Sequence, residues 1–533
     1  MATQNNALYA DCPYLHYDPR LGRRVLARHR YDGFRVLARL LGITGPAEGG
    51  EPRTEDGANA IIATFEVIGA DWAMDWLELS YRDWINDVKG KPAYGQVTLG
   101  NAQIGRFTYQ PSGAHWHMML LNASLGGGLA TPNDALRRWR QGITPDWFQA
   151  RVTVGEWAEI PFCRVTYFAS IFDMGLPAAI VAVKALSKAS LAKAGRRFRM
   201  PAILKKTAPN ASARLTRRKL WAGHLAVYDV GQGAAQALVR LDQSHVTPEL
   251  YIDMGCGRNH ALDAALPELR FCTSASPPVI LSHADEDHWC GAITETMATA
   301  GYPAHKLEWT APATTGSAAF MAFAHSIWSQ GGSVRTLDLT GPPPNILAAT
   351  TKTGELLIAQ GTSKQFNHSG LIVAVVRQDN QHYWLLPGDC DYHFFPAELK
   401  SMASKQCCVA LTAFHHGAEP MTQGAIPLAV GGDYRRLVYS FGCGNHHKHP
   451  TLSAATGHHA AGWIHDAGWL AKPGSSLPGG GSCARATAWT PIAAPPPYTH
   501  AGGVLIGWSI APTLPSAALC CNSGCRAIVP EQI

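Results

Sequence analysis

The stretch VILSHADEDHWCG, residues 279–291, decides how this sequence is interpreted. Its apolar start predicts a buried strand, and the loop that follows carries His283, Asp285, Asp287 and His288. Alternating positions project together if the loop stays extended, and His288 follows from the turn into a helix. Imidazole nitrogens and carboxylate oxygens are donors for zinc, manganese or iron. A solvated acidic loop is the alternative, but the buried lead-in and the glycine exit favour a metal site.

Three further segments repeat this pattern, in which an apolar strand ends in acids or histidines. They are WLLPGDCDYHFF (384–395), VALTAFHHGAEP (409–420) and LVYSFGCGNHHKHPT (437–451). Each segment alone is compatible with an ordinary polar turn. Four strands that all end in metal-type ligands predict one shared site.

The four segments together resemble the metallo-β-lactamase superfamily. Their elements HADEDH, GD, HHG and S-x-G-x-x-N-x-x-x-H-P are similar to the hydrolase domain of competence DNA-uptake (ComEC-type) proteins. YDVGQG (228–233) and YIDMG (251–255) match the element that opens such domains and the strand after it. The resemblance covers residues ~220–452 and implies an α/β fold, the αββα sandwich. The membrane helices of the DNA-uptake proteins are absent, so the resemblance implies a relative that is not a transporter.

The resemblance also implies a role for each matching ligand. His283 and Asp285 would hold one metal ion, and Asp287 and His288 would hold the other. Asp389 would bridge the two ions. The expected cofactors are therefore two divalent metal ions.

The remaining histidines have less definite roles in the resemblance. His415 or His416 would complete the shell of the second ion, and the sequence leaves this choice open. His368, in NHSG, is the candidate for a ligand that precedes the bridging aspartate in many relatives. His449 would lie over the substrate phosphate or the leaving group.

Asp285 stands where the commoner H-x-H-x-D-H form has a histidine. A harder oxygen donor at this position makes manganese or magnesium more competitive with zinc. The sequence therefore leaves the metal open among zinc, manganese and magnesium.

Two metal ions about 3.5–4 Å apart can share a hydroxide, lower its pKa and stabilise charge that develops on a phosphate or carbonyl oxygen. The first hypothesis is therefore phosphodiester hydrolysis, in DNA or RNA, with the metal-bound hydroxide as nucleophile. Asp287 or Asp389 would orient the water, and His449 would act as an electrostatic stabiliser or acid.

Two other functions stay open. One is hydrolysis of a small ester, lactone, thioester or cyclic nucleotide in a narrow pocket. The other is an inactive metal-binding interaction module, in which a Trp-rich N-terminal unit would carry recognition. The near-complete ligand set argues against the inactive module, because an inactive site tends to lose such acids and histidines.

The 533 residues predict more than one domain. We expect a separate α+β unit of unknown role over 1–192, a basic linker over 193–219 and the hydrolase domain over 220–456. The remaining residues, 457–533, form a Gly-, Pro- and Ala-rich extension that could complete the hydrolase fold.

Apolar spacing within the first unit predicts helices over 20–41 and 70–88, and also over 176–191. Residues 151–172, rich in Val, Ile, Phe and Tyr, predict strands. The HWH triplet at 115–117 is interpreted as ordinary polar sequence.

No acidic residue occurs between Gly175 and Tyr228, whereas twelve Lys or Arg do, most densely over 193–219. This stretch is either a solvated linker or a strip that binds the phosphates of DNA or RNA. The net charge of +6 permits an anionic substrate without requiring one. The sequence says nothing of the oligomeric state.

The chain shows no signal peptide and no run of about eighteen apolar residues. Its thirteen cysteines are an odd number. We therefore expect reduced thiols, a cytoplasmic location and no membrane partner.

Overall fold

The computed structural model divides into two compact units, residues 1–201 with 316–329, and residues 202–315 with 330–533. Up to residue 207 it describes the six strands named next and residues 189–190. From 208 to 520 it describes most of the chain, and the longest gaps there are 258–269, 474–483, 488–502 and 509–518. All structural statements below concern these described residues.

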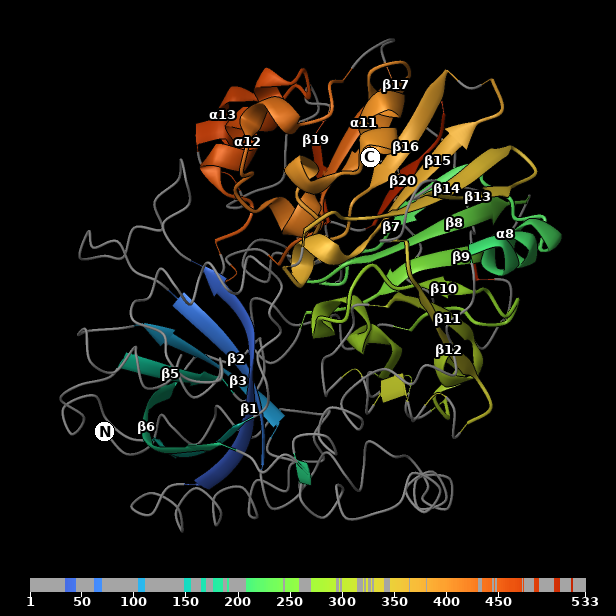
Figure 1. Ribbon diagram of the computed structural model, residues 1–533. Coiled ribbons are helices and arrows are strands. Elements are labelled where there is room, and N and C mark those ends of the chain that lie inside the picture. The colour runs from blue at the N-terminus through green and yellow to red at the C-terminus, as the bar shows by residue number, and fades with distance from the viewer. Residues whose placement is uncertain are drawn as a thin grey trace, which may run out of the picture. The chain divides into compact units, whose positions relative to one another are not determined.

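The described strands of the first unit form a closed antiparallel barrel in the order β1-β2-β3-β5-β6-β4 (Figure 1). The strands are β1 (Phe34–Thr44), β2 (Ile62–Gly69), β3 (Ile104–Gln110), β4 (Phe148–Val154), β5 (Arg164–Phe168) and β6 (Leu176–Ala185). β4 and β5 confirm the strands predicted within 151–172.

Two helix predictions in this unit are wrong. Residues 34–41 belong to β1, and residues 176–185 form β6. Spacing that suits a helix was overridden by pairing, since β1 lies between β2 and β4, and β6 lies between β5 and β4. Residues 20–33, the helix predicted over 70–88 and the HWH triplet lie outside the described residues.

The second unit contains two sheets with helices. The first sheet has the order β12-β11-β10-β9-β8-β7-β20, with β21 paired to β9. Its strands are β7 (His224–Val227), β8 (Ala235–Leu241), β9 (His245–Met254), β10 (Val279–Ile280), β11 (Glu308–Pro312), β12 (Ser333–Leu337), β20 (Val504–Ile506) and β21 (Leu519–Cys520). Strands β9 to β12 are parallel, so their carboxyl ends lie at one edge.

The second sheet has the order β13-β14-β15-β16-β17-β18-β19. Its strands are β13 (Ile346–Thr350), β14 (Gly354–Gln360), β15 (Leu371–Arg377), β16 (His382–Leu386), β17 (Cys407–Thr412), β18 (Arg436–Tyr439) and β19 (Ala484–Ala486). Strands β16 to β19 are parallel.

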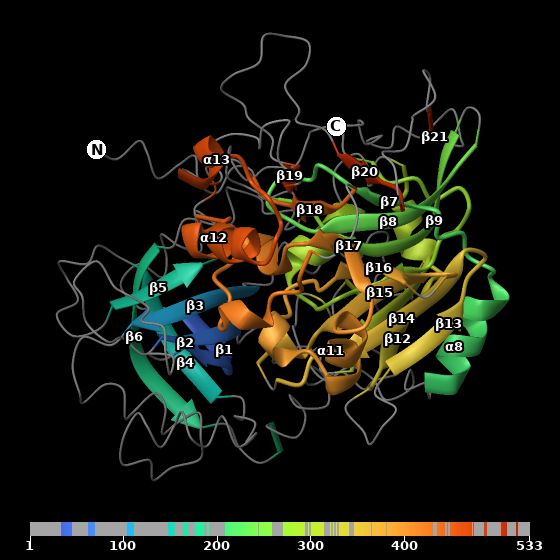
Figure 2. The same ribbon diagram turned by 90° about the horizontal axis from the view of Figure 1, so that it is seen from above.

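An apolar core joins the two sheets. It combines side chains of β7 to β10 with side chains of β13 to β18, among them Ile252, Val373 and Trp384. A second core includes buried side chains of the second sheet and of α11 (Ala397–Ala403), α12 (Leu452–Ala460) and α13 (Ala467–Ala471). Figures 1 and 2 show these helices beside the second sheet. The unit is thus a mixed α/β structure with two sheets flanked by helices.

Short apolar runs after residue 220 predict eight strands, and each overlaps a strand of the structure. The predicted ranges are 225–230, 250–254, 279–282, 356–359, 371–376, 383–386, 409–413 and 437–441. They correspond to β7, β9, β10, β14, β15, β16, β17 and β18. The sequence between two of these runs also predicts a helix over 396–404, and the structure has α11 there. The segment after residue 457 supplies β19 to one sheet and β20 to the other. Trp508 then stacks on the buried Trp384, with ring centroids 3.8 Å apart.

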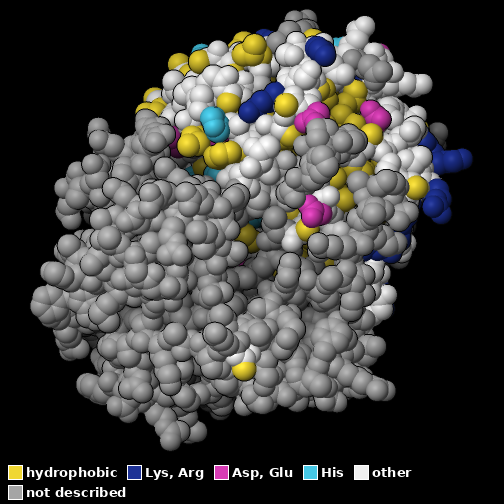
Figure 3. Space-filling model, in the orientation of Figure 1, with side chains coloured by type: hydrophobic (Ala, Val, Ile, Leu, Met, Phe, Trp, Pro, Cys, Tyr) yellow, Lys and Arg dark blue, Asp and Glu magenta, His cyan; other side chains and the backbone are white. Residues whose placement is uncertain are grey.

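The basic stretch contains α8 (Ala208–Arg217), which lies at one edge of the second unit (Figure 1). Figure 3 shows Lys and Arg side chains gathered at that edge. Arg214 and Arg218 form salt bridges with Glu308, and Arg335 reaches the same carboxylate at 3.1 Å. Part of the basic charge is therefore already paired within the protein.

None of the helices in the described residues is long and apolar enough to cross a membrane.

Candidate metal centre

The candidate ligands come from loops that follow parallel strands in both sheets. His283, Asp285, Asp287 and His288 follow β10, and Asp389 follows β16. The pair His415-His416 follows β17, and His449 follows β18. The carboxyl ends of parallel strands meet at one edge of a sheet, so the chain brings ligands that are far apart in sequence to one place.

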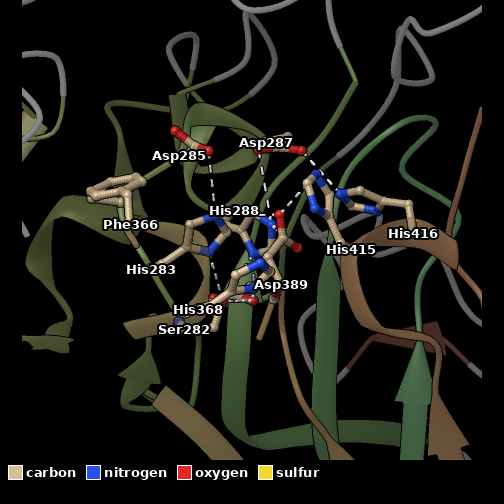
Figure 4. Close-up of polar contacts among 12 residues, drawn as sticks. Ser282, His283, Asp285, Asp287, His288, Phe366, His368, Asp389, His415 and His416 are labelled. Carbon is tan, nitrogen blue, oxygen red and sulfur yellow. Dashed lines mark hydrogen bonds and ion pairs between the residues drawn. The ribbon is translucent and has the colours of Figure 1, made fainter. Parts of the chain in front are cut away.

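Two groups of side chains lie close enough to hold metal ions. One is His283, His288 and Asp389, and the other is Asp287, His288 and His416. Within each group the ligand atoms lie within 4.8 Å of one another, and all five residues are buried. Figure 4 shows the side chains of both groups pointing toward a common centre.

The carboxylate of Asp389 lies close to side chains of the loop after β10 and of the loop after β17. Its Oδ1 lies 3.0 Å from Nε2 of His288, and its Oδ2 lies 3.4 Å from Nε2 of His283. Nε2 of His415 also lies 3.4 Å from Oδ2. A single carboxylate thus faces three imidazoles.

His416 faces the other side of the centre. Its Nδ1 donates a hydrogen bond of 2.7 Å to the carbonyl of Ser440, which leaves Nε2 3.0 Å from Oδ2 of Asp287. The side chain of His415 is 32% exposed, whereas that of His416 is 3% exposed. Of the two, His416 is the more firmly oriented.

Asp285, His368 and His449 lie at the border of the centre. Oδ2 of Asp285 lies 3.5 Å from Nε2 of His283. Nδ1 of His368 faces backbone, 3.2 Å from the carbonyl of Asp389, and His368 belongs to neither ligand group. The ring of His449 is 5.3 Å from that of His415, centroid to centroid.

Two supporting residues had no role in the sequence analysis. Asp253, at the end of β9, lies 2.8 Å from Nδ1 of His288 and accepts hydrogen bonds from the backbone and hydroxyl of Ser282. The signal for Asp253 was the YIDMG segment, which places one acid at the end of an apolar strand. Ser440, the serine of the S-x-G-x-x-N-x-x-x-H-P element, accepts from His416 through its carbonyl and donates through Oγ to the carbonyl of Gly233.

Carboxylates and imidazoles alternate in the centre, so each shifts the pKa of its neighbours. Burial alone would lower the pKa of His288, but the carboxylates of Asp389, Asp253 and Asp287 hold it well above its usual value. Burial and His288 oppose protonation of His283, yet Asp389 and Asp285 raise its pKa to about 9. In the metal-free protein the protons on His288 and His283 therefore balance the charge of the carboxylates, as a metal ion would.

Burial would raise the pKa of the acids, but the imidazoles more than offset this effect. The pKa of Asp389 is held well below its usual value by His415, His288 and His283. His288 and His416 likewise lower the pKa of Asp287. The acids therefore stay ionised, as metal ligands must be.

The residues fit a metal. Four buried atoms of the centre make no well-aligned hydrogen bond, although two of them, Nε2 of His288 and Oδ1 of Asp389, face each other as an ion pair: Nε2 of His283, Nε2 of His288, Oδ1 of Asp287 and Oδ1 of Asp389. Buried polar atoms are rarely left unsatisfied, because each costs about 1–3 kcal/mol. Nitrogen and carboxylate oxygen in one cluster are a donor set for zinc or manganese.

Close backbone packing supports the ligand loop. The amide of Ala234, in the turn after YDVGQG, donates to the carbonyl of Asp287 at 3.0 Å. A Cβ on Gly255 would lie 1.5 Å from the same carbonyl. Both segments quoted for the resemblance therefore lie directly against the ligand loop.

Six cysteines that the structure describes are thiols not joined in disulfides: Cys256, Cys272, Cys290, Cys390, Cys407 and Cys408.

In the comparisons with known proteins, no family model and no curated protein matched this chain.

Proposed function

We propose that this protein is a metal-dependent hydrolase of the metallo-β-lactamase type, with the αββα arrangement in its second unit and two divalent ions at the centre around Asp389. The observation that carries the proposal is the set of four unsatisfied buried ligand atoms converging from β10 and β16. His283, His288 and Asp389 would hold one ion, and Asp287 and His416 would hold the other, with Asp389 between them. His288 lies within reach of both groups.

This assignment departs from the roles that the resemblance implies at the first ion. His288 takes the place of Asp285 beside His283, because Nε2 of His288 lies 3.0 Å from Asp389 and 3.9 Å from Asp287, and Asp285 belongs to neither ligand group. Of the two histidines that the sequence left open, we propose His416 for the second ion, because Ser440 orients it. Zinc and manganese suit this donor set, and magnesium stays possible.

The bound ions would supply Lewis acidity and a nucleophilic water near neutral pH. The protein's own contribution is to hold the buried ligands in place and to keep Asp287 and Asp389 ionised. Asp287 or Asp389 would orient the water. His415 and His449, at the more exposed side, are placed to contact the substrate or its leaving group.

A phosphodiester is the substrate class we propose, and nucleic acid is the proposed source. This choice is supported by the resemblance and by the imidazoles at the exposed side, which suit an anionic group. The described part of the basic stretch, residues 208–219, lends it no geometric support. Arg218 reaches Glu308 and the carbonyl of Ser276, at the amino ends of β11 and β10, whereas the ligands follow the carboxyl end of β10.

The test combines metal analysis with hydrolysis of bis-p-nitrophenyl phosphate and of DNA and RNA. We expect wild type to bind two equivalents of zinc or manganese and to hydrolyse the ester. Asp287→Ala should lose most of the activity. Asp379→Ala is the matched control, because Asp379 pairs with Arg377 in the turn between β15 and β16. Absence of stoichiometric metal from wild type, or full activity of Asp287→Ala, would refute the proposal.

A further inference from the structure

A chain of buried polar side chains lies under the turn that carries His415 and His416. The hydroxyl of Tyr392 lies 2.8 Å from Nε2 of His458, and the hydroxyl of Tyr439 lies 3.1 Å from Nδ1 of the same ring. Tyr439 also lies 3.1 Å from Nε2 of His465. All four side chains are buried, and none belongs to the candidate metal centre.

The direction of the hydrogen bonds in this chain follows from His458. Its Nδ1 lies 2.7 Å from the carbonyl of Ala454 and therefore carries the proton. Burial lowers the pKa of His458 to about 3, so the ring is neutral at pH 7. Nε2 then accepts from the hydroxyl of Tyr392, whose oxygen is left to accept the amide hydrogen of Phe414 at 3.4 Å.

The hydrogen bond between Phe414 and Tyr392 can anchor the turn that follows, whose backbone conformation needs support. His415 and His416 have φ angles of 44° and 58°, in the left-handed region that non-glycine residues rarely occupy. Such residues persist only where the surroundings hold them in place. The amide of His415 donates to the carbonyl of Gly388 at 3.0 Å, which is a second anchor beside the one at Phe414.

We propose that Tyr392, oriented by His458, is a positioning residue for the His415-His416 turn. Tyr392 follows Asp389 by three positions, so one side chain ties the loop of the bridging carboxylate to the turn of the histidine pair. Its ring also packs edge-on against Phe414, with centroids 5.0 Å apart. The role of this anchor in metal binding rests on the proposed function, whereas the anchoring of the turn does not.

Hydrogen exchange in the metal-free protein tests the anchor directly. Tyr392→Phe keeps the ring and removes only the hydroxyl. Tyr439→Phe is the matched control, because it also removes a buried hydroxyl from His458 but leaves the hydrogen bond between Tyr392 and the amide of Phe414 in place. We expect peptides that cover 413–418 to exchange about tenfold faster in Tyr392→Phe and at the wild-type rate in Tyr439→Phe. Equal exchange in the two variants would overturn the proposal.

Titration with Co²⁺, followed by its visible absorption, provides the second readout. In Tyr392→Phe the second equivalent should bind about 10–100-fold more weakly with an altered spectrum, and Tyr439→Phe should match wild type. An unchanged second equivalent in Tyr392→Phe would contradict the link from the anchor to the ligands. If wild type itself bound no Co²⁺, the proposed function would fail, and the exchange result would still decide whether Tyr392 anchors the turn.

Discussion

Nδ1 of His288 lies 2.8 Å from Oδ2 of Asp253, and this contact leaves Nε2 of His288 directed at Asp389. The same carboxylate accepts from the amide of Ser282 at 2.6 Å and from its hydroxyl at 2.8 Å. Asp253 therefore fixes both the tautomer of a ligand and the start of the ligand loop. A carboxylate behind a metal-bound histidine commonly serves this purpose.

Replacing Asp253 with Asn should weaken metal binding about 10–100-fold, because the amide is a poorer acceptor for the imidazole N–H. Asn tolerates the φ of 60° found at this position, so the backbone should be preserved. Competition titration with a chromogenic chelator measures the loss. Asp379→Asn, at an exposed turn, should bind metal as wild type does, and equal affinities in the two variants would contradict the assignment of Asp253.

The two adjacent histidines should differ in their effect on metal content. His416→Ala should reduce the bound metal from two equivalents to one, because the buried His416 is oriented by Ser440 toward Asp287. His415→Ala should keep more of the second equivalent and lose activity instead, since the side chain is partly exposed beside Asp389. Elemental analysis after dialysis measures both. Loss of metal in His415→Ala alone would reverse the choice between them.

The stability of the metal-free protein should depend on pH through this centre. The pKa of His283 is raised from 6.5 to about 9, so its contribution is fully present below pH 6.5 and is lost as pH rises through about 9. The pKa of Asp389 is lowered, so its contribution is present above pH 3.8 and is lost as pH falls further.

Urea unfolding of the metal-free protein should therefore show a midpoint that falls between pH 6.5 and 9. His283→Asn should flatten this part of the profile. Metal binding at pH 7 should release protons, because it displaces the one on His283. Calorimetry in two buffers of different ionisation enthalpy counts them, and binding without proton release would contradict this prediction.

The basic stretch over 193–219 should contribute little to the reaction. Replacing Arg217, Arg218 and Lys219 with Ala should leave hydrolysis of bis-p-nitrophenyl phosphate unchanged, since Arg218 lies at the amino ends of the strands. We also expect DNA affinity and its dependence on salt to stay as in wild type. If the strip binds phosphates, the slope of log K against log salt should instead become shallower by about 0.9 for each charge removed.

The sequence indicated the ligands but not the residues that hold them. The ligands follow from local patterns, whereas the supporting contacts join residues that are far apart in the chain. HADEDH, GD and HHG each follow an apolar strand within a few residues, so local pattern was enough to find them. The contact between Asp253 and His288 depends on the parallel pairing of Tyr251 with Val279, and that between Tyr392 and His458 spans 66 positions. Such contacts exist only once the sheets have assembled.

The same limit explains the wrong helices in the first unit. Residues 176–185 have apolar positions on every side, so periodicity does not separate a buried strand from a helix. The pairing of β6 with both β4 and β5 decides for the strand. In the second unit, β11 (EWTAP) and β12 (SVRTL) are short and mix polar with apolar residues, and they were missed for want of a strong pattern.

Gly255 offers a test of the packing between β9 and the ligand loop. A Cβ at this position would lie 1.5 Å from the carbonyl oxygen of Asp287, and the neighbouring carbonyl of Ala234 is 2.8 Å away. Neither backbone atom can rotate aside, so Gly255→Ala must displace the loop that carries Asp287 and His288. We expect a loss of at least about 1–3 kcal/mol in the free energy of unfolding, the usual cost of overpacking.

Chemical denaturation of the metal-free protein measures this loss, and metal titration shows whether the displaced loop still binds. Gly424→Ala is the matched control, because nothing lies within 4 Å of a Cβ there and the backbone is not left-handed. It should keep wild-type stability and metal binding. If Gly255→Ala bound both metal equivalents as wild type does, metal binding would not depend on the close contact between Gly255 and Asp287, and the prediction would be wrong.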